Sequence, residues 1–152
     1  MSKEQTLVLV KPDAVQRALA GSVISRLEGR GLRIVAMKML QMSREMASSH
    51  YSAHEGKAFF EGLVDFITSS PIIAMTLEGP DAVEMVRNTM GATNPVQAQP
   101  GTIRGDLGVD IGHNLVHGSD SPESAAKEIA LFFNRDEILS YERDVDRWVT
   151  GP

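Results

Sequence analysis

The sequence contains no cysteine, which excludes disulfides, thiolate nucleophiles and cysteine-bound zinc. Aromatic residues make up only 5% of it. No apolar run approaches the roughly 18 residues that a transmembrane helix needs, and residues 1–5 lack the positive patch and apolar segment of a secretory signal. We therefore expect a cytoplasmic protein that folds without disulfides or a structural metal.

Positive charge is also scarce, because 15 Lys and Arg stand against 20 Asp and Glu, a formal net charge of −5. This balance argues against a nucleic-acid coat or a polybasic membrane patch, both of which need excess positive charge. An acidic protein still binds an anion where a few cations gather. The length of 152 residues with 42% hydrophobic residues is typical of one compact domain, here residues 1–152.

Hydrophobic periodicity indicates alternating strands and helices. Strands are predicted over 7–10, 32–40 and 72–77 and around 115–116. Helices are predicted over 20–29, after Ser43, over 60–67, from Gly79-Pro80 with Pro80 at its first position, and after Ser121-Pro122. Residues 91–112 show no sustained period, and residues 134–152 are not assigned to any element.

This order contains two split β-α-β units and predicts a ferredoxin-like α+β sandwich, a four-stranded antiparallel sheet of βαββαβ topology covered by helices. A doubly wound parallel sheet is the competing architecture. It is disfavoured because each half of the chain has too few strand and helix pairs.

Several common catalytic motifs are missing. Gly56-Lys57 lacks the leading glycine of a P-loop, and Gly29-Arg30-Gly31 precedes a strand, the wrong context for a dinucleotide fingerprint. Two histidine pairs have i, i+4 spacing, His50 with His54 and His113 with His117. The second lies in strand-like sequence without the glutamate of a zinc helix, and we expect zinc at neither pair.

The segment 114–121 is the most informative. His117 ends a short apolar strand, and Gly118 is expected to leave one face of the imidazole open. A neutral histidine is a nucleophile able to form a covalent intermediate. Glu128 points toward the interior in the helix that follows, where a carboxylate needs a partner such as Ser119 or His117. The alternative is a structural histidine beside an ordinary solvated glutamate.

Three cations lie next to segments that are able to converge: Lys11 at a strand exit, Arg87 late in a helix and Arg104 in a glycine-rich turn. A cation about 4 Å from a phosphate contributes roughly 4 kcal/mol at an effective dielectric near 20. The alternatives are an exposed charge at Arg87 and an Arg104–Asp106 pair, which contributes only about 0–1 kcal/mol. Phe59, just before the helical stripe, is placed to stack a base or to join the core.

Taken in order, these motifs closely resemble the nucleoside diphosphate kinase family from about residue 6 to residue 133. The resemblance is carried by Lys11-Pro12-Asp13, by residues 90–95 and 100–106, and by Asn114-x-x-His117-Gly118-Ser119-Asp120 followed by Glu128. It implies transfer of the γ-phosphate of a nucleoside triphosphate to a nucleoside diphosphate, in a ping-pong reaction through a phosphohistidine at His117.

The resemblance also implies the remaining site residues. The catalytic group is His117, Glu128, Ser119 and Lys11. The groups that contact ribose and phosphates or line the site are Lys11, Asn114, Arg87, Thr93, Arg104, Tyr51 and His54, and those that hold the base are Phe59 and Ile111. Mg²⁺ is implied as a cofactor bridged mainly by the nucleotide phosphates rather than by protein ligands.

A homo-oligomer is implied as well, with a hexamer favoured over a tetramer and with the loop around Pro95 contributing to trimer contacts. The sequence departs from the family pattern at Ala58, Leu107 and His113, where proline, an aromatic residue and arginine are common. None of these positions matches a catalytic residue, so we expect effects on nucleotide affinity and subunit contacts rather than loss of activity.

Two other functions remain open from the residues alone. One is a histidine-dependent phosphohydrolase, in which water removes the phosphate. The other is a non-catalytic ferredoxin-like module that binds RNA on its sheet. The RNA-binding alternative is disfavoured because the predicted strands carry no aromatic residue.

Overall fold

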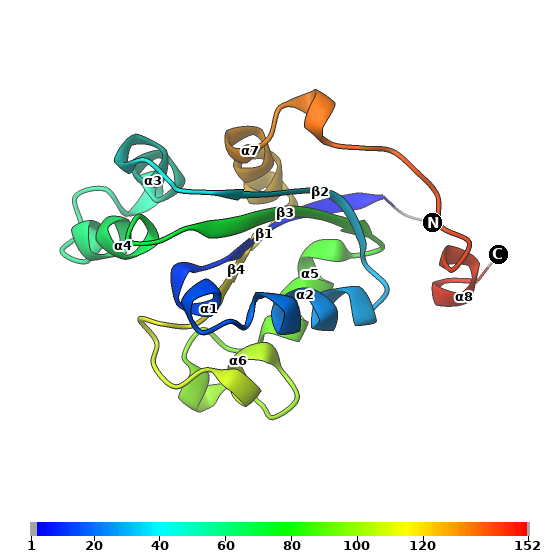
Figure 1. Cartoon of the computed structure of the whole chain (residues 1–152), viewed down its shortest axis with the longest axis horizontal. Helices are drawn as coiled ribbons and strands as arrows, with labels where there is room; N and C mark the ends of the chain where they lie inside the picture. Colours follow the sequence, from blue (N-terminus) through cyan, green and yellow to red (C-terminus); the bar gives the residue numbers. More distant parts are fainter. Residues whose placement is uncertain (1–2, 152) are drawn as a thin grey trace.

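Four strands within residues 3–151, the part of the chain described by the computed structural model, form one antiparallel sheet in the order β2-β3-β1-β4 (Figure 1). The strands are β1 (Glu4–Val10), β2 (Arg33–Leu40), β3 (Ile72–Gly79) and β4 (Val116–Gly118). β1 is central and pairs with β3 along its length and with β4 through Val8, Leu9 and Val10. The expected ferredoxin-like fold is confirmed.

Helices and short 3-10 turns make the connections. Their bounds are α1 (Pro12–Gln16), α2 (Ala20–Gly29), α3 (Arg44–His50), η1 (Ser52–His54), α4 (Phe60–Ile67), α5 (Ala82–Met90), η2 (Pro95–Gln97), α6 (Ile103–Leu107), α7 (Pro122–Phe132), η3 (Arg135–Glu137) and α8 (Asp146–Val149). No helix in this described part is long and apolar enough to cross a membrane.

Both faces of the sheet are covered, which explains the unbroken apolar run of β1. Successive side chains of a strand point to opposite faces. Leu7 and Leu9 therefore pack in the core under α3, α4 and α7, while Val8 and Val10 pack in the core under α2, α5 and α6. Figure 1 shows α3 and α7 on one side of the sheet and α2, α5 and α6 on the other.

Helix starts are correctly predicted where a serine caps the helix. The side chain of Ser43 accepts a hydrogen bond from the Met46 amide, and Ser121 accepts one from the Ser124 amide. The start at Pro80 is wrong, because Gly79 belongs to β3 and α5 begins at Ala82. The turn before α5 uses a left-handed conformation at Asp81, which hydrophobic spacing does not reveal.

Residues 91–112 contain two short helical elements that periodicity does not predict. Asn94 caps η2 by accepting from the Val96 amide, and Thr102 caps α6 by accepting from the Gly105 amide. Elements of three and five residues are too short to show a helical period. Their caps organise the segment that carries Arg104.

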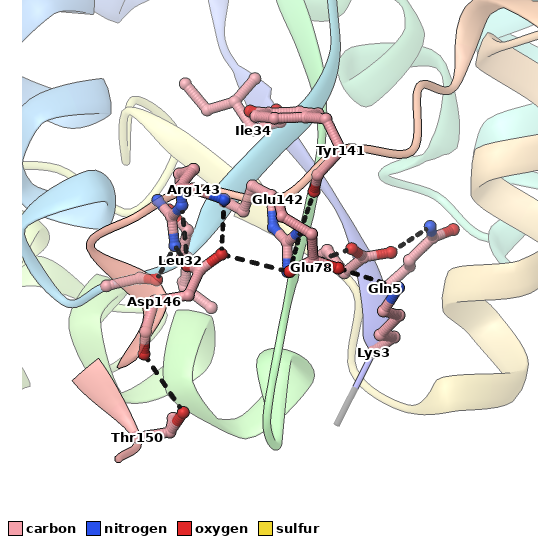
Figure 2. Close-up of polar contacts among 12 residues, drawn as sticks. Lys3, Gln5, Leu32, Ile34, Glu78, Tyr141, Glu142, Arg143, Asp146 and Thr150 are labelled. Carbon is pink, nitrogen blue, oxygen red and sulfur yellow. Dashed lines mark hydrogen bonds and ion pairs between the residues drawn. The ribbon is translucent and has the colours of Figure 1, made fainter. Parts of the chain in front are cut away.

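Polar contacts hold the C-terminal segment to the sheet, and Figure 2 shows Tyr141, Arg143 and Asp146 of this segment near Leu32 and Glu78. Arg33 of β2 is 1% exposed, and it donates to the Tyr141 carbonyl and forms ion pairs with Glu78 and Asp146 at 3.8 and 3.7 Å. Arg143 adds a hydrogen bond to the Gly31 carbonyl at 2.8 Å. Arg33 and Tyr141 are 108 residues apart in sequence and Arg143 and Gly31 are 112 apart, so no local pattern predicted where this segment lies.

Candidate active site

His117 lies in β4 opposite Leu9 of β1, and its side chain is 26% exposed. Its Nε2 is 2.7 Å from Oε1 of Glu128. An ionised carboxylate only accepts hydrogen bonds, so Nε2 carries the ring proton. The lone pair of the neutral imidazole is therefore on Nδ1, which makes Nδ1 the nucleophilic atom.

Glu128 lies on α7 and is held from two sides. The Ser119 hydroxyl donates to the same Oε1 at 2.9 Å and accepts from the Leu7 amide at 3.3 Å. Burial raises the pKa of the Glu128 carboxyl, but the hydrogen bonds and charge of His117 and the bond from Ser119 outweigh burial and leave this pKa below its usual value. The inward direction expected for Glu128 is observed, and both suggested partners bind it.

Gly118 has a different role from the one expected. A Cβ at this position would lie 2.7 Å from Sδ of Met90 and 2.8 Å from Val86, so it would clash with α5 and not with the imidazole. The reason is the alternation of the strand, which places residues 117 and 118 on opposite faces. Gly118 allows β4 to pack closely on α5.

The expected convergence of Lys11, Arg87 and Arg104 is observed around β4. Lys11 Nζ donates to Oδ1 of Asn114 at 2.8 Å, and Arg87 donates to the Gly118 carbonyl at 3.2 Å. Arg104 is 4% exposed and donates to the carbonyls of Asn114, Gly91 and Val116 at 3.1, 3.1 and 2.6 Å.

Asp106 does not pair with Arg104. Its carboxylate instead binds Arg26 at 2.6 Å on the outer side of the same loop. The guanidinium of Arg104 is therefore directed inward, toward the strand that carries His117.

The cations of this cluster are crowded and poorly solvated. Burial and the charge of Arg104 lower the pKa of Lys11 to about 8. Burial and the charge of Arg87 lower the pKa of Arg104 to about 10. An anion with several negative oxygens would relieve this repulsion, so the cluster favours a polyphosphate ligand.

The lowered pKa of Lys11 predicts an alkaline limb in activity. Lys11 is charged below pH about 8 and neutral above it, so attraction to phosphates is present at lower pH and is lost as pH rises. We expect kcat/KM to fall above pH about 8, by up to about tenfold per unit, because kcat/KM follows the ionisation of the free enzyme. Steady-state kinetics between pH 7 and 9.5 measure this.

Lys11→Arg is the matched control, because a guanidinium stays charged over this range. Its absolute rate is expected to be lower, but its profile should lack the limb near pH 8. A limb of equal size in wild type and Lys11→Arg would assign the titration to another group.

The sequence pattern missed a further anchor of β4. Oδ2 of the buried Asp13 accepts from the Leu115 amide at 3.0 Å, and the Lys11 amide donates to the Leu115 carbonyl at 2.9 Å. Leu115 has φ of 75°, which costs about 1–3 kcal/mol for a residue other than glycine. These bonds hold the strained turn between Asn114 and His117. The sequence did contain a signal for this anchor. Pro12 is the first residue of α1 as well as the residue that stops β1, and Asp13 follows it in the first turn of that helix.

The residues expected to line the nucleotide site lie in two segments. One carries Tyr51, His54 and Phe59, and the other carries Ile111. Ring contacts join Tyr51 to His54 at 6.4 Å and His54 to Phe59 at 5.2 Å between centroids. Phe59 is 52% exposed and Ile111 is 56% exposed. Burial, reinforced by the charge of Glu128, raises the pKa of Tyr51 to about 12, so its hydroxyl remains a hydrogen-bond donor.

The two segments are connected. The Phe66 ring of α4 contacts His113 at 4.9 Å between centroids, next to the turn that carries Ile111. On the phosphate side, Asn114 donates to the Thr93 carbonyl at 3.0 Å, which places Thr93 beside the cations. A cavity of about 680 Å³ lies between β1, α7 and η3. None of the candidate site residues lines it, so we do not assign it to the active site.

His50 of α3 is a neighbour of His117 that the sequence pattern did not connect with it. The two rings meet edge to face with centroids 4.8 Å apart. Burial, with the positive charge that His117 can carry, lowers the pKa of His50 to about 3. The ring of His50 is therefore neutral at physiological pH.

A histidine with one free nitrogen, held by a carboxylate on a ferredoxin-like sheet and next to clustered cations, defines the class of phosphotransferases that carry phosphate on histidine. The nucleoside diphosphate kinase family model matches residues 4–138. The chain belongs to the nucleoside diphosphate kinase family. Its activity is the transfer of the γ-phosphate of a nucleoside triphosphate to a nucleoside diphosphate, by a ping-pong reaction through a phosphohistidine intermediate.

Known proteins agree with this assignment over nearly the whole chain. Nucleoside diphosphate kinase of Carboxydothermus hydrogenoformans is 58% identical over 146 residues, 96% of this chain and 98% of the relative. The structure of the Halobacterium salinarum enzyme in complex with CDP is 52% identical, with a TM-score of 0.94 over 97% of this chain and 98% of that one. A nucleoside diphosphate kinase family protein of Babesia bovis is 43% identical, with a TM-score of 0.93 over 96% and 99%.

Proposed function

We propose that His117 is the residue that carries the phosphoryl group, with Glu128 and Ser119 orienting its ring. The observation that carries this assignment is the 2.7 Å contact between Nε2 and Glu128, which leaves the lone pair on Nδ1. Nδ1 attacks the γ-phosphorus, and the bond from that phosphorus to the bridging oxygen breaks, with release of the diphosphate. A β-phosphate oxygen of the acceptor then attacks the phosphohistidine and restores the imidazole.

The clustered cations bind the phosphates in this proposal. Lys11, Arg87 and Arg104 compensate the charge that spreads over the phosphoryl oxygens during transfer. Thr93 and Asn114 bind phosphate and ribose beside them, since Asn114 already bonds both Lys11 and the Thr93 carbonyl. Lys11 thus acts both in binding and in catalysis.

The base is held mainly by stacking. Phe59 and Ile111 are exposed apolar side chains on the two connected segments, and Tyr51 and His54 line the site between Phe59 and His117. Stacking with few contacts to base edges tolerates different bases. The neighbour from Halobacterium salinarum binds CDP, and we propose the same class of ligand here, nucleoside di- and triphosphates.

Mg²⁺ is proposed as a cofactor that arrives with the nucleotide. Mg²⁺ prefers an octahedron of oxygens, often from substrate phosphates. Among the residues that the structure describes, the group of at least three possible ligands is His50, His117 and Glu128, whose two imidazoles do not suit Mg²⁺. The phosphate oxygens would therefore hold the ion, which supplies charge neutralisation.

We propose a cytoplasmic homo-oligomer formed by one domain per chain, with a hexamer favoured over a tetramer. The 3-10 turn at Pro95 supports subunit contact, because Val96 beside it is 81% exposed. Light scattering on the eluting protein measures the number of subunits.

Mass measurement of the ATP-treated protein tests the catalytic assignment. We expect one phosphoryl group per subunit, located on His117 and removed by a nucleoside diphosphate. Glu128→Gln keeps the shape but loses the charged acceptor, so we expect phosphorylation about 10²–10³-fold slower, in the range typical of proton-handling and orienting groups, with nucleotide binding nearly unchanged.

The contrary outcomes are distinct. A phosphoryl group on another residue would show that His117 is not the nucleophile. Release of free phosphate at the turnover rate, without an acceptor, would favour the hydrolase alternative. A normal phosphorylation rate in folded Glu128→Gln would return this glutamate to a structural role.

A further inference from the structure

The side chains of His50, His117 and Glu128 form a cluster. One ligand atom from each lies within 4.8 Å of the others. Neither i, i+4 histidine pair of the sequence forms this group. Each pair supplies one histidine, and the packing of α3 against the sheet brings the two together.

His50 has an unusual environment for a polar side chain. Both ring nitrogens are buried, and neither has a hydrogen-bond partner among the residues that the structure describes. The ring makes edge-to-face contacts with His117 and with Phe132, at 4.8 and 5.6 Å between centroids. An unpaired buried polar group costs about 1–3 kcal/mol, and a ligand on one nitrogen would recover part of that cost.

The ligand that suits these atoms is a borderline transition-metal ion. Two imidazoles and one carboxylate form a set that binds Zn²⁺ at roughly 2.0–2.2 Å and leaves a fourth position open. Tetrahedral coordination places ligand atoms about 3.3 Å apart. The group reaches this spacing if His50 closes inward and the 2.7 Å contact between His117 and Glu128 opens slightly.

A cavity beside this group offers an entry path that is lined by none of Lys11, Arg87 and Arg104. This cavity of about 230 Å³ is lined by His50 and Glu128 together with Ser49, Ser52, Ser124 and Lys127. A hydrated ion can therefore reach His50 and Glu128 without passing Lys11, Arg87 or Arg104. Lys127 at this cavity opposes a cation and limits the affinity.

We propose that His50, His117 and Glu128 form an inhibitory site for Zn²⁺ in the unphosphorylated enzyme. The ion binds Nε2 of His117 in place of the hydrogen bond to Glu128, and the ring proton moves to Nδ1. Nδ1 then has no lone pair to attack a phosphorus atom. The binding site stands on the geometry alone, whereas the inhibition rests on the proposed role of His117.

Calorimetric titration of the untagged protein with Zn²⁺, without nucleotide or Mg²⁺, tests the site. We expect one ion per subunit. His50→Phe keeps an aromatic ring but removes the nitrogens, so zinc affinity should fall about tenfold or more. Exchange without zinc should stay within about threefold of wild type, because neither nitrogen of His50 has a hydrogen-bond partner to lose among the described residues. His113→Asn, which removes an exposed histidine paired with Asp110, should leave zinc binding unchanged.

The zinc-edge X-ray absorption spectrum of the wild-type complex gives a test that needs no variant. It should show two imidazoles and one carboxylate oxygen. Zinc that binds equally well to His50→Phe, a spectrum with fewer than two imidazoles, or the absence of stoichiometric binding would overturn the site.

Phosphorylation tests the inhibition separately. The zinc-loaded enzyme should take up no phosphoryl group until a chelator is added. Normal phosphorylation of the zinc-loaded enzyme would overturn the inhibition. Failure of the zinc-free enzyme to form a phosphohistidine would contradict the proposed role of His117, while the calorimetry would still decide whether the metal binds.

Discussion

His117→Ala is expected to slow phosphoryl exchange by about 10⁶-fold, the scale on which loss of a covalent nucleophile slows other enzymes. His113 also pairs with a carboxylate, Asp110, at 3.1 Å, but that pair is exposed. The His117 ring is held by Glu128 at 2.7 Å in a strand surrounded by the clustered cations. Coupled-assay rates, with single-turnover measurements for the variant, determine the change.

Nucleotide binding serves as the control for this variant. The phosphate contacts are assigned to Lys11, Arg87 and Arg104, so the dissociation constant of a nucleoside diphosphate should change by less than about threefold. Residual exchange above about 1% of the wild-type rate, in protein freed of wild-type enzyme, would place the nucleophile elsewhere. That much activity is far more than an enzyme keeps when its covalent nucleophile is removed.

Arg104→Met is expected to weaken both stability and catalysis. Three carbonyls lose their donor, those of Asn114 and Val116 in buried hydrogen bonds and that of Gly91 in a partly buried one. At about 1–3 kcal/mol for each unpaired group, the free energy of unfolding should fall by about 3 kcal/mol. For a chain of this size that corresponds to roughly 6–12 °C in Tm. In the protein that stays folded, loss of a cation worth roughly 4 kcal/mol beside a phosphate lowers kcat/KM by up to about 10³-fold.

Arg26→Met is the matched control, because Arg26 binds the same loop from its exposed side through Asp106. Loss of an exposed pair costs only about 0–1 kcal/mol, and no phosphate contact is lost. Thermal unfolding and kinetics on both variants separate the two effects. Equal stability of the two variants would contradict the structural role of Arg104, and unchanged kcat/KM in folded Arg104→Met would contradict its phosphate contact.

Local pattern predicted most of the scaffold. The unbroken apolar run at residues 7–10 correctly indicated a buried strand, and Ser43 and Ser121 correctly marked helix starts. The ordered motifs around Lys11, Arg104 and His117 were sufficient to indicate the family, which the comparisons confirm. Short capped elements such as α6 were not predicted, because five residues are too few to show a helical period.

The geometry of the site depended on contacts that no local pattern encodes. Lys11 and Asn114 bond across 103 positions of sequence, and that contact exists because β1 and β4 are neighbours in the sheet. The direction of Gly118 toward α5 and the meeting of His50 with His117 also follow from packing across the sheet.

The sequence by itself therefore determined the order of the elements, the fold class and the family, because periodicity, caps and motifs act over a few residues. Only the tertiary structure decided which nitrogen of His117 is free, how Arg104 is held, and that His50 lies beside His117. Hydrogen bonds and ring contacts between distant segments depend on strand register and helix packing, which are set by burial of the whole core rather than by neighbours in the chain.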